Sequence, residues 1–335
     1  MLRRFGALAV GGMGVAGLAG VASARIDRSS GPGYEVWTVT DQQTYDLSDG
    51  ETLSNVLVDQ SAPGARLTIR ARNTSGWTVK NVGFVGVGQY GDKEFQFQVS
   101  CPSGASGRIE DVWMNGKARG GQSATSLGGI YVRSSHAGHL DVRHTYIEGF
   151  GNNACYASAV GKDGGRNGTT TLENCYHRDN TVSQFRIGAP GDRVRNCVGV
   201  VDDPKGRRGT YPYFNDQNAR GIWGKHFPNQ NVENSSFYVS PNDVNPGGAF
   251  CARYISGRSH GSDADLDASN CRVNANAPTL TQTTSNAHVS FTNLGHDPTV
   301  NVIQGGGVPL SPKMAALGQR QMPPELPTDP ASTTA

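Results

Sequence analysis

The sequence predicts an all-β solenoid, in which short strands wind into stacked coils, and two observations point to this class. Glycine provides 45 of the 335 residues while strong helix formers are sparse, so turns and strands should dominate. In addition, one short motif recurs along the chain at unequal steps. A repeat whose period varies while its core holds is typical of stacked units joined by loops of free length.

The recurring motif supplies one corner to each coil. It consists of an apolar residue, a spacer, Asn or a close equivalent, and a small or β-branched residue. Its members are VKNV (79–82), IEDV (109–112), VRHT (142–145), LENC (172–175), VRNC (194–197), VENS (232–235) and ASNC (268–271). Asn tolerates the left-handed backbone of a sharp bend, and its amide can hydrogen-bond to the Asn of the next coil. Asp111 and His144 depart from Asn. The residues that we expect to stack near one corner are Asn81, Asn174, Asn196, Asn234 and Asn270.

A second strand-like run precedes each motif, so that each unit holds three short strands. These runs are FQFQVS (95–100), GIYVRSS (129–135), ACYAS (154–158), SQFRIG (183–188), GIWGKH (221–226) and FCARYI (250–255). In this arrangement the sequence resembles the right-handed parallel β-helix family, whose best-known members are pectate lyases and related secreted polysaccharide enzymes. The resemblance covers roughly residues 65 to 275 and implies a right-handed parallel β-helix. It is weak for activity, because no catalytic signature of a lyase or hydrolase subfamily is intact.

The chain divides into four expected segments. Residues 1–24 have the pattern of a cleavable export signal similar to twin-arginine signals, with Arg3 and Arg4 before a weakly apolar, Gly-rich run that ends at Ala24. A permanent anchor helix is the alternative. Residues 25–64 should form an amino-terminal cap, 65–305 the β-helix, and 306–335 a Pro-rich disordered tail. No segment after the signal could span a membrane. The export signal predicts an extracellular or cell-surface location.

Charge and cysteine usage exclude several classes of protein. Thirty Lys and Arg against 28 Asp and Glu leave a net charge of +2, so no whole-chain field attracts nucleic acid or an anionic membrane. The six cysteines lack the Cys-x-x-Cys and Cys/His spacings of redox and zinc sites. Coils stack about 4.8 Å apart, so Cys175 and Cys197 should be neighbours in one interior row. We expect free thiols, with a disulfide between these two as the alternative.

The first strands of the coils should carry two outward rows of side chains, if Ile130, Cys155, Phe185 and Ile222 point inward. One row is Tyr131, Tyr156, Gln184 and Trp223, and the other is Arg133, Ser158, Arg186 and Lys225. Aromatic faces beside cations can stack sugar rings and pair with their carboxylates or sulfates. This pattern indicates an acidic polysaccharide as the partner. The alternative is the ordinary decoration of an exposed strand, because aromatic residues and Arg suit strands.

The longest connection between two corners, from Asn196 to Asn234, should bring further residues to the same edge. In the resembled family the corresponding loop walls the substrate cleft, and long loops on a rigid scaffold are often functional. The further candidates are Asp202, Asp203, Tyr211 and Tyr213 from this loop, His226 after the next strand, and Asp179 from the coil below.

Two chemistries compete for this surface. A lyase needs a base to remove a proton beside a carboxylate, and Arg186 or Lys225 could be that base. No cofactor is required, although Asp202 and Asp203 could hold a calcium ion. A glycoside hydrolase needs an acid and a base, which Glu148, Asp179, Asp202 and Asp203 could supply. The cation row is better defined than any carboxylate pair, which favours the lyase.

A third interpretation is not enzymatic. Plain coils with a cap and a tail would serve equally as an adhesin or as a structural part of a cell envelope or virion, since a fold does not imply a function.

Overall fold

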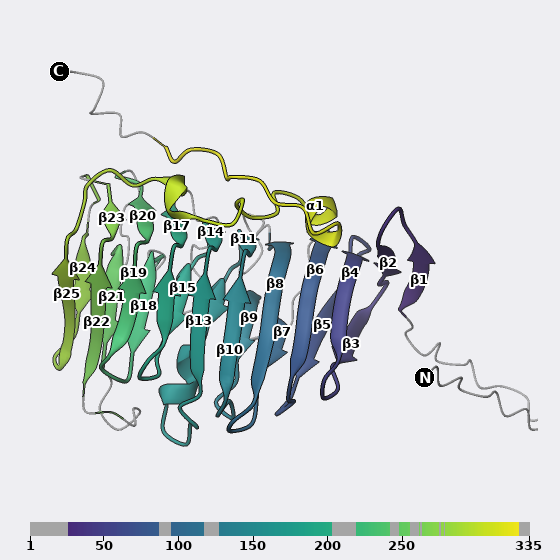
Figure 1. Cartoon of the computed structure of the whole chain (residues 1–335), viewed down its shortest axis with the longest axis horizontal. Helices are drawn as coiled ribbons and strands as arrows, with labels where there is room; N and C mark the ends of the chain where they lie inside the picture. The colour runs from purple at the N-terminus through teal and green to yellow at the C-terminus, as the bar shows by residue number, and fades with distance from the viewer. Residues whose placement is uncertain are drawn as a thin grey trace, which may run out of the picture.

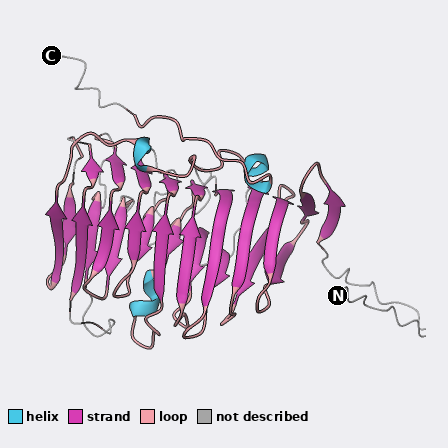
Figure 2. Ribbon diagram, viewed as in Figure 1, coloured by secondary structure: helices cyan, strands magenta, loops and turns pink. Residues whose placement is uncertain are grey.

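The computed structural model describes residues 26–86, 95–116, 127–202, 219–241, 248–254, 261, 263–274, 276–277 and 279–327. Within these residues the chain winds as a right-handed parallel β-helix, and short strands account for nearly all of the regular structure (Figures 1 and 2). The fold class expected from the sequence is therefore confirmed. The expected export signal, residues 1–24, lies outside the described residues.

The coils contribute to two sheets. The nine-stranded sheet runs in the order β24 (Thr281–Thr283), β21 (Phe250–Arg253), β18 (Ile222–Lys225), β15 (Phe185–Ile187), β12 (Cys155–Tyr156), β9 (Gly128–Val132), β7 (Phe95–Val99), β5 (Arg66–Ala71) and β3 (Gln42–Asp46). Each neighbouring pair in it is parallel, so every coil adds one strand in the same direction.

The second sheet has 16 strands and branches at β8. Its unbranched part is β1 (Asp27–Ser30), β2 (Glu35–Thr38), β4 (Thr52–Asp59), β6 (Trp77–Val85) and β8 (Ser106–Asn115). One branch is β10 (His139–Arg143), β13 (Thr169–Glu173), β16 (Arg193–Arg195), β19 (Gln230–Glu233), β22 (Ala264–Ser269) and β25 (Ala287–Thr292). The other branch is β11 (Tyr146–Glu148), β14 (Tyr176–Arg178), β17 (Val198–Val201), β20 (Ser236–Val239) and β23 (Arg272–Val273).

Alternation along the short strands builds the core. In β10, β13, β16 and β19 the inward positions are Val142, Leu172, Val194 and Val232, which pair in register and are fully buried. Burying one such side chain stabilises the fold by about 1.5 to 3 kcal/mol. The core is therefore a set of apolar columns that run along the helix axis, with polar side chains left on the outside.

Residues in the left-handed conformation form the predicted corner. They are Asn55, Asn81, Asp111, His144, Asn174, Asn196, Asn234, Asn270 and Asn293, with φ between 46° and 60°. Side-chain amides bond between neighbouring coils in three places, from Asn81 to Asn55 at 2.7 Å, from Asn234 to Asn196 at 2.7 Å and from Asn293 to Asn270 at 2.8 Å. The five Asn residues expected at one corner are confirmed there, and the column extends by one residue at each end.

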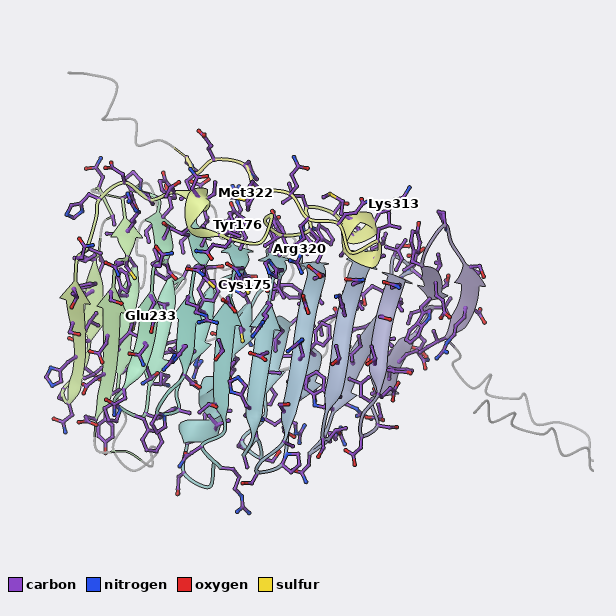
Figure 3. The ribbon with its side chains drawn as sticks, in the orientation of Figure 1. Cys175, Tyr176, Glu233, Lys313, Arg320 and Met322 are labelled. Carbon is purple, nitrogen blue, oxygen red and sulfur yellow. The ribbon has the colours of Figure 1, made fainter. Side chains whose placement is uncertain are left out.

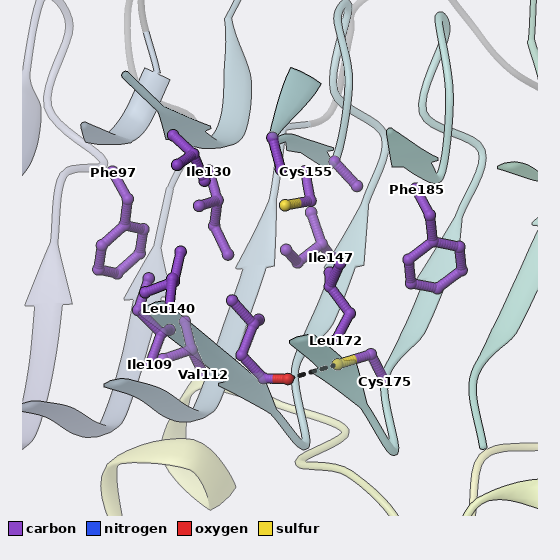
Figure 4. Packing of buried hydrophobic residues seen from close by; sticks show 14 of the residues in the cluster. Phe97, Ile109, Val112, Ile130, Leu140, Ile147, Cys155, Leu172, Cys175 and Phe185 are labelled. Atoms are coloured by element: carbon purple, nitrogen blue, oxygen red, sulfur yellow. Dashed lines mark hydrogen bonds between the residues drawn. The ribbon is translucent and has the colours of Figure 1, made fainter. Parts of the chain in front are cut away.

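The cysteines fill the interior as small apolar groups. All six are buried free thiols. Cys175 and Cys197 follow the corner residues of adjacent coils, and the backbone N–H of Cys175 donates to Cys197 Sγ at 3.4 Å. The Cys175 thiol in turn lies 3.6 Å from the carbonyl oxygen of Val142 (Figure 4). The interior row of free thiols matches the sequence-based expectation.

The amino-terminal region differs from the expected cap over residues 25–64. Only β1 and β2 pair antiparallel, whereas β2 and β4 already run parallel to the strands that follow. The strand β3 likewise pairs parallel with β5. Parallel winding thus begins near residue 35, and Asn55 provides its first corner.

The carboxyl-terminal region departs from the expected disordered tail. Residues 299–327, named here the C-terminal strap, run back along the outside of the coils over β20, β17, β14 and β11 (Figure 1). The strap contains the 3-10 helix η2 (Val300–Val302) and the short helix α1 (Pro312–Ala316). Its apolar residues pack on the outward face of these strands in a second core that includes Tyr176, Val198 and Val200. Burial of this apolar surface explains why the Pro-rich composition does not leave residues 306–327 disordered.

Specific contacts hold the strap to the corner column. Arg320 forms ion pairs with Asp111 and Glu110, and Figure 3 shows Arg320 beside the ends of the strands. His144 Nδ1 donates to the carbonyl oxygen of Gly307 at 2.9 Å. Both corner positions that depart from Asn therefore bind the strap through their side chains. A third corner residue, Asn174, accepts a hydrogen bond from the backbone N–H of Gln304 at 2.9 Å.

Among the helices of the described residues, none has the length and apolar character that a membrane crossing would need.

Candidate functional site

The register of the nine-stranded sheet defines one outward row of side chains. Tyr131 pairs with Tyr156, Tyr156 with Arg186, and Arg186 with Trp223. The row continues from Trp223 to Cys251. Four adjacent coils thus place two tyrosines, an arginine and a tryptophan side by side.

This register corrects the expected rows at β15. Phe185 points inward, so the next residue, Arg186, occupies the outward position that was expected for Gln184. Gln184 is completely buried, and its side chain closes the preceding turn by bonding to both the backbone and the amide of Asn180. In the neighbouring row, the position that was expected for Arg186 belongs to Gly188, where a Cβ atom would meet Ser158 Cβ at 2.6 Å.

Arg186 is held between two aromatic rings. Its Cζ lies 3.8 Å from the ring centroid of Tyr156 and 4.4 Å from that of Trp223. Its Nε donates a hydrogen bond to Ser158 Oγ at 2.7 Å. Stacking on two rings and a hydrogen bond at Nε fix the plane of the guanidinium group, which is the geometry that suits bidentate binding of a carboxylate or sulfate.

Two more cations surround Trp223. Arg220 Cζ lies 4.1 Å and Lys225 Nζ 4.6 Å from its ring centroid. We call Arg186, Arg220, Trp223 and Lys225 the Trp223 cluster. Their exposed fractions are 7%, 4%, 6% and 5%, respectively. Three basic side chains are thus gathered around one buried indole.

Among the described residues, no carboxylate pairs with the basic side chains of Arg186 and Lys225. Neither of these two residues takes part in any ion pair within the described part of the chain. Burial and the charges of Arg186, Arg253, Lys162 and Arg220 lower the pKa of Lys225 to about 5. Burial also lowers the pKa of Arg186. Lys225 is therefore an uncharged amine at neutral pH, whereas an arginine stays protonated in proteins.

The tyrosines extend the cluster toward the amino-terminal coils. Tyr131 and Tyr156 lie edge to face at 5.3 Å, and both are half-buried. Burial raises the pKa of Tyr156, but the charges of Arg186 and Lys162, together with side-chain interactions with Lys162 and Ser158, outweigh burial and lower this pKa below its usual value. Lys162 is exposed, and its Nζ lies 5.4 Å from the Tyr156 ring centroid.

The remaining residues expected in the site take different positions. Arg133 is half-buried and donates to Gln98 at 3.4 Å, beside Tyr131. His226 is buried and directly follows β18 with a φ of 75°. Asp203, Tyr211 and Tyr213 lie outside the described residues.

The expected carboxylates are not part of the cluster. Asp179 and Asp202 both pair with Arg178, at 2.9 Å and 3.3 Å, and Asp179 also accepts the backbone N–H of Asp202. These residues follow β14 and β17 in the 16-stranded sheet rather than the sheet of Arg186. Within the described ranges, no group of three or more His, Cys, Asp or Glu residues could hold a metal ion. A calcium ion at Asp202 and Asp203 remains a prediction.

Sequence reasoning missed Arg220, Lys162 and Arg253. Arg220 lies just before β18, outside the strand, so the alternation of side chains along the strand does not predict where it points. Its guanidinium group nevertheless lies over the ring of Trp223. Lys162 follows the short 3-10 helix η1 (Ser158–Gly161), which interrupts the expected strand. Only Arg253, opposite Lys225 in the adjacent strand, carried a signal, because it belongs to the run FCARYI.

Comparisons with known proteins give the chain no family. No family model and no curated protein matches it. Among solved structures it is similar to catalytic domains described as GH87 alpha-1,3-glucanase, one in complex with tetrasaccharides and two with nigerose. The identity is 11%, the TM-scores are 0.38, 0.33 and 0.34, and the match covers 77% of this chain and 63% of each of those chains. The chain thus spans less than two thirds of their length. At these TM-scores the similarity says nothing about what the chain binds, and its own strand ladders establish it as a right-handed parallel β-helix.

Proposed function

We propose that this protein binds an acidic polysaccharide at the Trp223 cluster and cleaves it by β-elimination, with Lys225 as the base. One observation carries the proposal: Arg186, a buried cation without a carboxylate partner among the described residues, stacks on aromatic faces beside the amine of Lys225. Burying charge costs free energy unless an opposite charge or hydrogen bonds compensate. An anionic sugar supplies that charge and stacks its ring on the aromatic row.

Arg186 and Lys225 suit different roles in the elimination. Arg186 stays protonated, so it pairs with the sugar carboxylate and stabilises the negative charge that develops there. Lys225, whose pKa is about 5, has a free electron pair at neutral pH and removes the proton from the carbon beside that carboxylate. This division assigns the base to Lys225 and leaves Arg186 as the binding group.

Hydrolysis is less well supported. Both carboxylates of a hydrolase must flank the bond that breaks. Asp179 and Asp202 are engaged with Arg178 in the other sheet, and no carboxylate of the described residues is among the charges that shift the pKa values of Lys225 and Arg186. The same proposal includes an exported protein at the cell surface or outside the cell, with residues 1–24 removed. Amino-terminal sequencing of the secreted product tests this step.

The decisive experiment incubates the protein with polygalacturonate, alginate, heparin and a neutral glucan. Ultraviolet absorbance records the unsaturated product, and a reducing-end assay records any cleavage. A lyase raises both signals on an acidic substrate and a hydrolase raises only the second. Neither signal on any substrate would favour a non-catalytic binding or structural protein and would end the proposal of an enzyme.

Single substitutions in the Trp223 cluster test whether binding and cleavage take place there. Arg186→Ala should weaken binding of the acidic substrate by about 10- to 100-fold, the range for losing a charge-assisted hydrogen bond. Lys225→Met should remove the unsaturated product and leave binding largely intact. The matched control is Arg193→Ala, since Arg193 is an exposed arginine of β16 in the other sheet. If Arg193→Ala weakens binding as much as Arg186→Ala, the site is wrong.

A further inference from the structure

We infer that Tyr156 donates the proton that the leaving sugar oxygen takes up when the acidic chain is cut, an inference that rests on the proposed function. In an elimination the carbon that loses its proton carries the carboxylate, and the next carbon carries the leaving oxygen. The proton donor must therefore lie close to the group that binds the carboxylate, within reach of the leaving oxygen.

The geometry of the row meets this requirement. Arg186 lies between the rings of Tyr156 and Trp223, at 3.8 Å and 4.4 Å, and Lys225 Nζ lies 4.6 Å from the ring of Trp223. In the strand order, Tyr156 on β12 and Lys225 on β18 lie on either side of β15, the strand that carries the carboxylate-binding Arg186. Tyr156 is half-buried, so it is enclosed by the cluster and still reaches the surface where the ligand binds.

The surroundings of Tyr156 stabilise the phenolate that remains after proton donation. The positive charges of Arg186 and Lys162 both face its ring. Ser158 accepts a hydrogen bond from Arg186 and also interacts with Tyr156, so it ties the two groups together. Within the described part of the chain, the other titratable or charged groups that act on Tyr156 or Lys225 include Tyr131, Arg220, Cys251 and Arg253, and none of these four is a carboxylate.

The step balances without a further reactant. The bond between C5 and its hydrogen breaks, and the proton moves to Lys225 Nζ. The electron pair forms the double bond between C4 and C5, while the bond from C4 to the leaving oxygen breaks. That oxygen takes the phenolic proton of Tyr156 and becomes a hydroxyl group. A proton then returns from the Lys225 ammonium through water to the Tyr156 phenolate.

The two groups define a pH window. Lys225 must be deprotonated, so the rate rises as the pH increases through about 5. Tyr156 must be protonated, so the rate falls again as the pH approaches the pKa of Tyr156. Burial raises that pKa, but the cations Arg186 and Lys162 outweigh it and hold the pKa below its usual 10.0.

The test compares Tyr156→Phe with the parent protein on polygalacturonate, alginate and heparin, and on a uronoside that carries fluoride at C4. Fluoride leaves without a proton, whereas a sugar oxygen needs one. Phe keeps the ring on Arg186 and removes only the hydroxyl group. We expect kcat on the polysaccharide to fall by about 10²- to 10⁴-fold with KM little changed, and kcat on the fluoride to stay within about threefold.

Two further variants complete the test. Tyr146→Phe removes a tyrosine hydroxyl from β11, on the face beneath the C-terminal strap, and should behave as the parent. Lys162→Met should lower kcat on the polysaccharide without abolishing it and move the alkaline limb of the pH profile upward, because the phenolate loses one stabilising cation. In Tyr156→Phe the residual activity should lack this limb.

Each remaining outcome has one meaning. If Tyr156→Phe keeps the parent rate on the polysaccharide, or loses activity equally on the fluoride, Tyr156 is not the proton donor while the lyase proposal stands. If Lys162→Met abolishes activity and Tyr156→Phe does not, the donor is Lys162. If the parent cleaves none of the substrates, the proposed function fails, and the role of Tyr156 fails with it.

Discussion

At the scale of single residues, Asp111 and His144 show how one side chain can encode a contact with a distant part of the chain. Both keep the left-handed corner conformation, with φ of 54° and 50°. The side chain of each forms a hydrogen bond with the C-terminal strap, whereas an Asn at this position could bond to the Asn of the next coil. Asp and His tolerate this conformation better than most residues, so the corner survives the exchange.

Lys225 provides a prediction at this scale. Its pKa falls from 10.5 to about 5 on folding, so folding releases a proton between these pH values. The folded state is therefore destabilised progressively as the pH falls from 10.5 toward 5. Lys225→Met should raise the free energy of unfolding at pH 7 by about 2 to 4 kcal/mol. Urea unfolding should show that this gain shrinks at pH 9, and an equal gain at both pH values would contradict the low pKa.

The corners were predictable from sequence because the left-handed preference of Asn is local chemistry. The same signal was present in LSNV (53–56) and marks Asn55, which places the start of the winding before the expected cap boundary. The partners of Asp111 and His144 were not predictable. Arg320 lies 209 residues from Asp111, and Gly307 lies 163 residues from His144.

At the scale of elements, the alternation of inward and outward side chains along each strand determines which residues lie in the site. In β15 the inward Phe185 and Ile187 leave Arg186 between them as the outward residue. The expected rows placed Arg186 beside Ser158 and Lys225, two residues away from its actual register with Tyr156 and Trp223. The position of Arg220 needed the structure, because its side chain folds over Trp223 from outside the strand.

The strap provides the prediction at this scale. Asp111 is almost fully buried, with its carboxylate bound by Arg320. Arg320→Ala leaves that charge buried and unpaired, so it should lower the free energy of unfolding by about 2 to 4 kcal/mol. It should also speed proteolytic cleavage within the strap. The matched control is Lys313→Ala, because Lys313 is an exposed residue of α1 in the same segment. A variant with stability and cleavage like the parent would show that the ion pair does not hold the strap.

At the scale of the whole molecule, the β-helix keeps its working surfaces apart. The Trp223 cluster belongs to the nine-stranded sheet, while the strap covers the branch from β11 to β20 of the other sheet. Each coil contacts mainly its two neighbours, so a disturbance in one coil should reach distant coils weakly.

Additivity tests this separation. Lys225→Met and Arg320→Ala change residues several coils apart that share no partner. Their effects on the free energy of unfolding should therefore add within about 0.5 kcal/mol in the double variant. Urea unfolding of the parent, the two single variants and the double variant measures these free energies and completes the double-mutant cycle. A larger coupling energy would mean that the strap and the cluster sense each other through the solenoid.

The course of the strap also fixes how many coils this protein can have. The backbone N–H of Thr299 bonds to Ser236 of β20, Gln304 bonds to Asn174, and Gly307 bonds to His144. Each step along the strap thus meets a coil further back, and coils repeat about every 4.8 Å. The strap therefore has a length that matches this number of coils. A solenoid normally gains or loses a coil at little cost in stability. Here an added or deleted coil between β11 and β20 would shift the strap residues that follow it away from the corner residues that they bind.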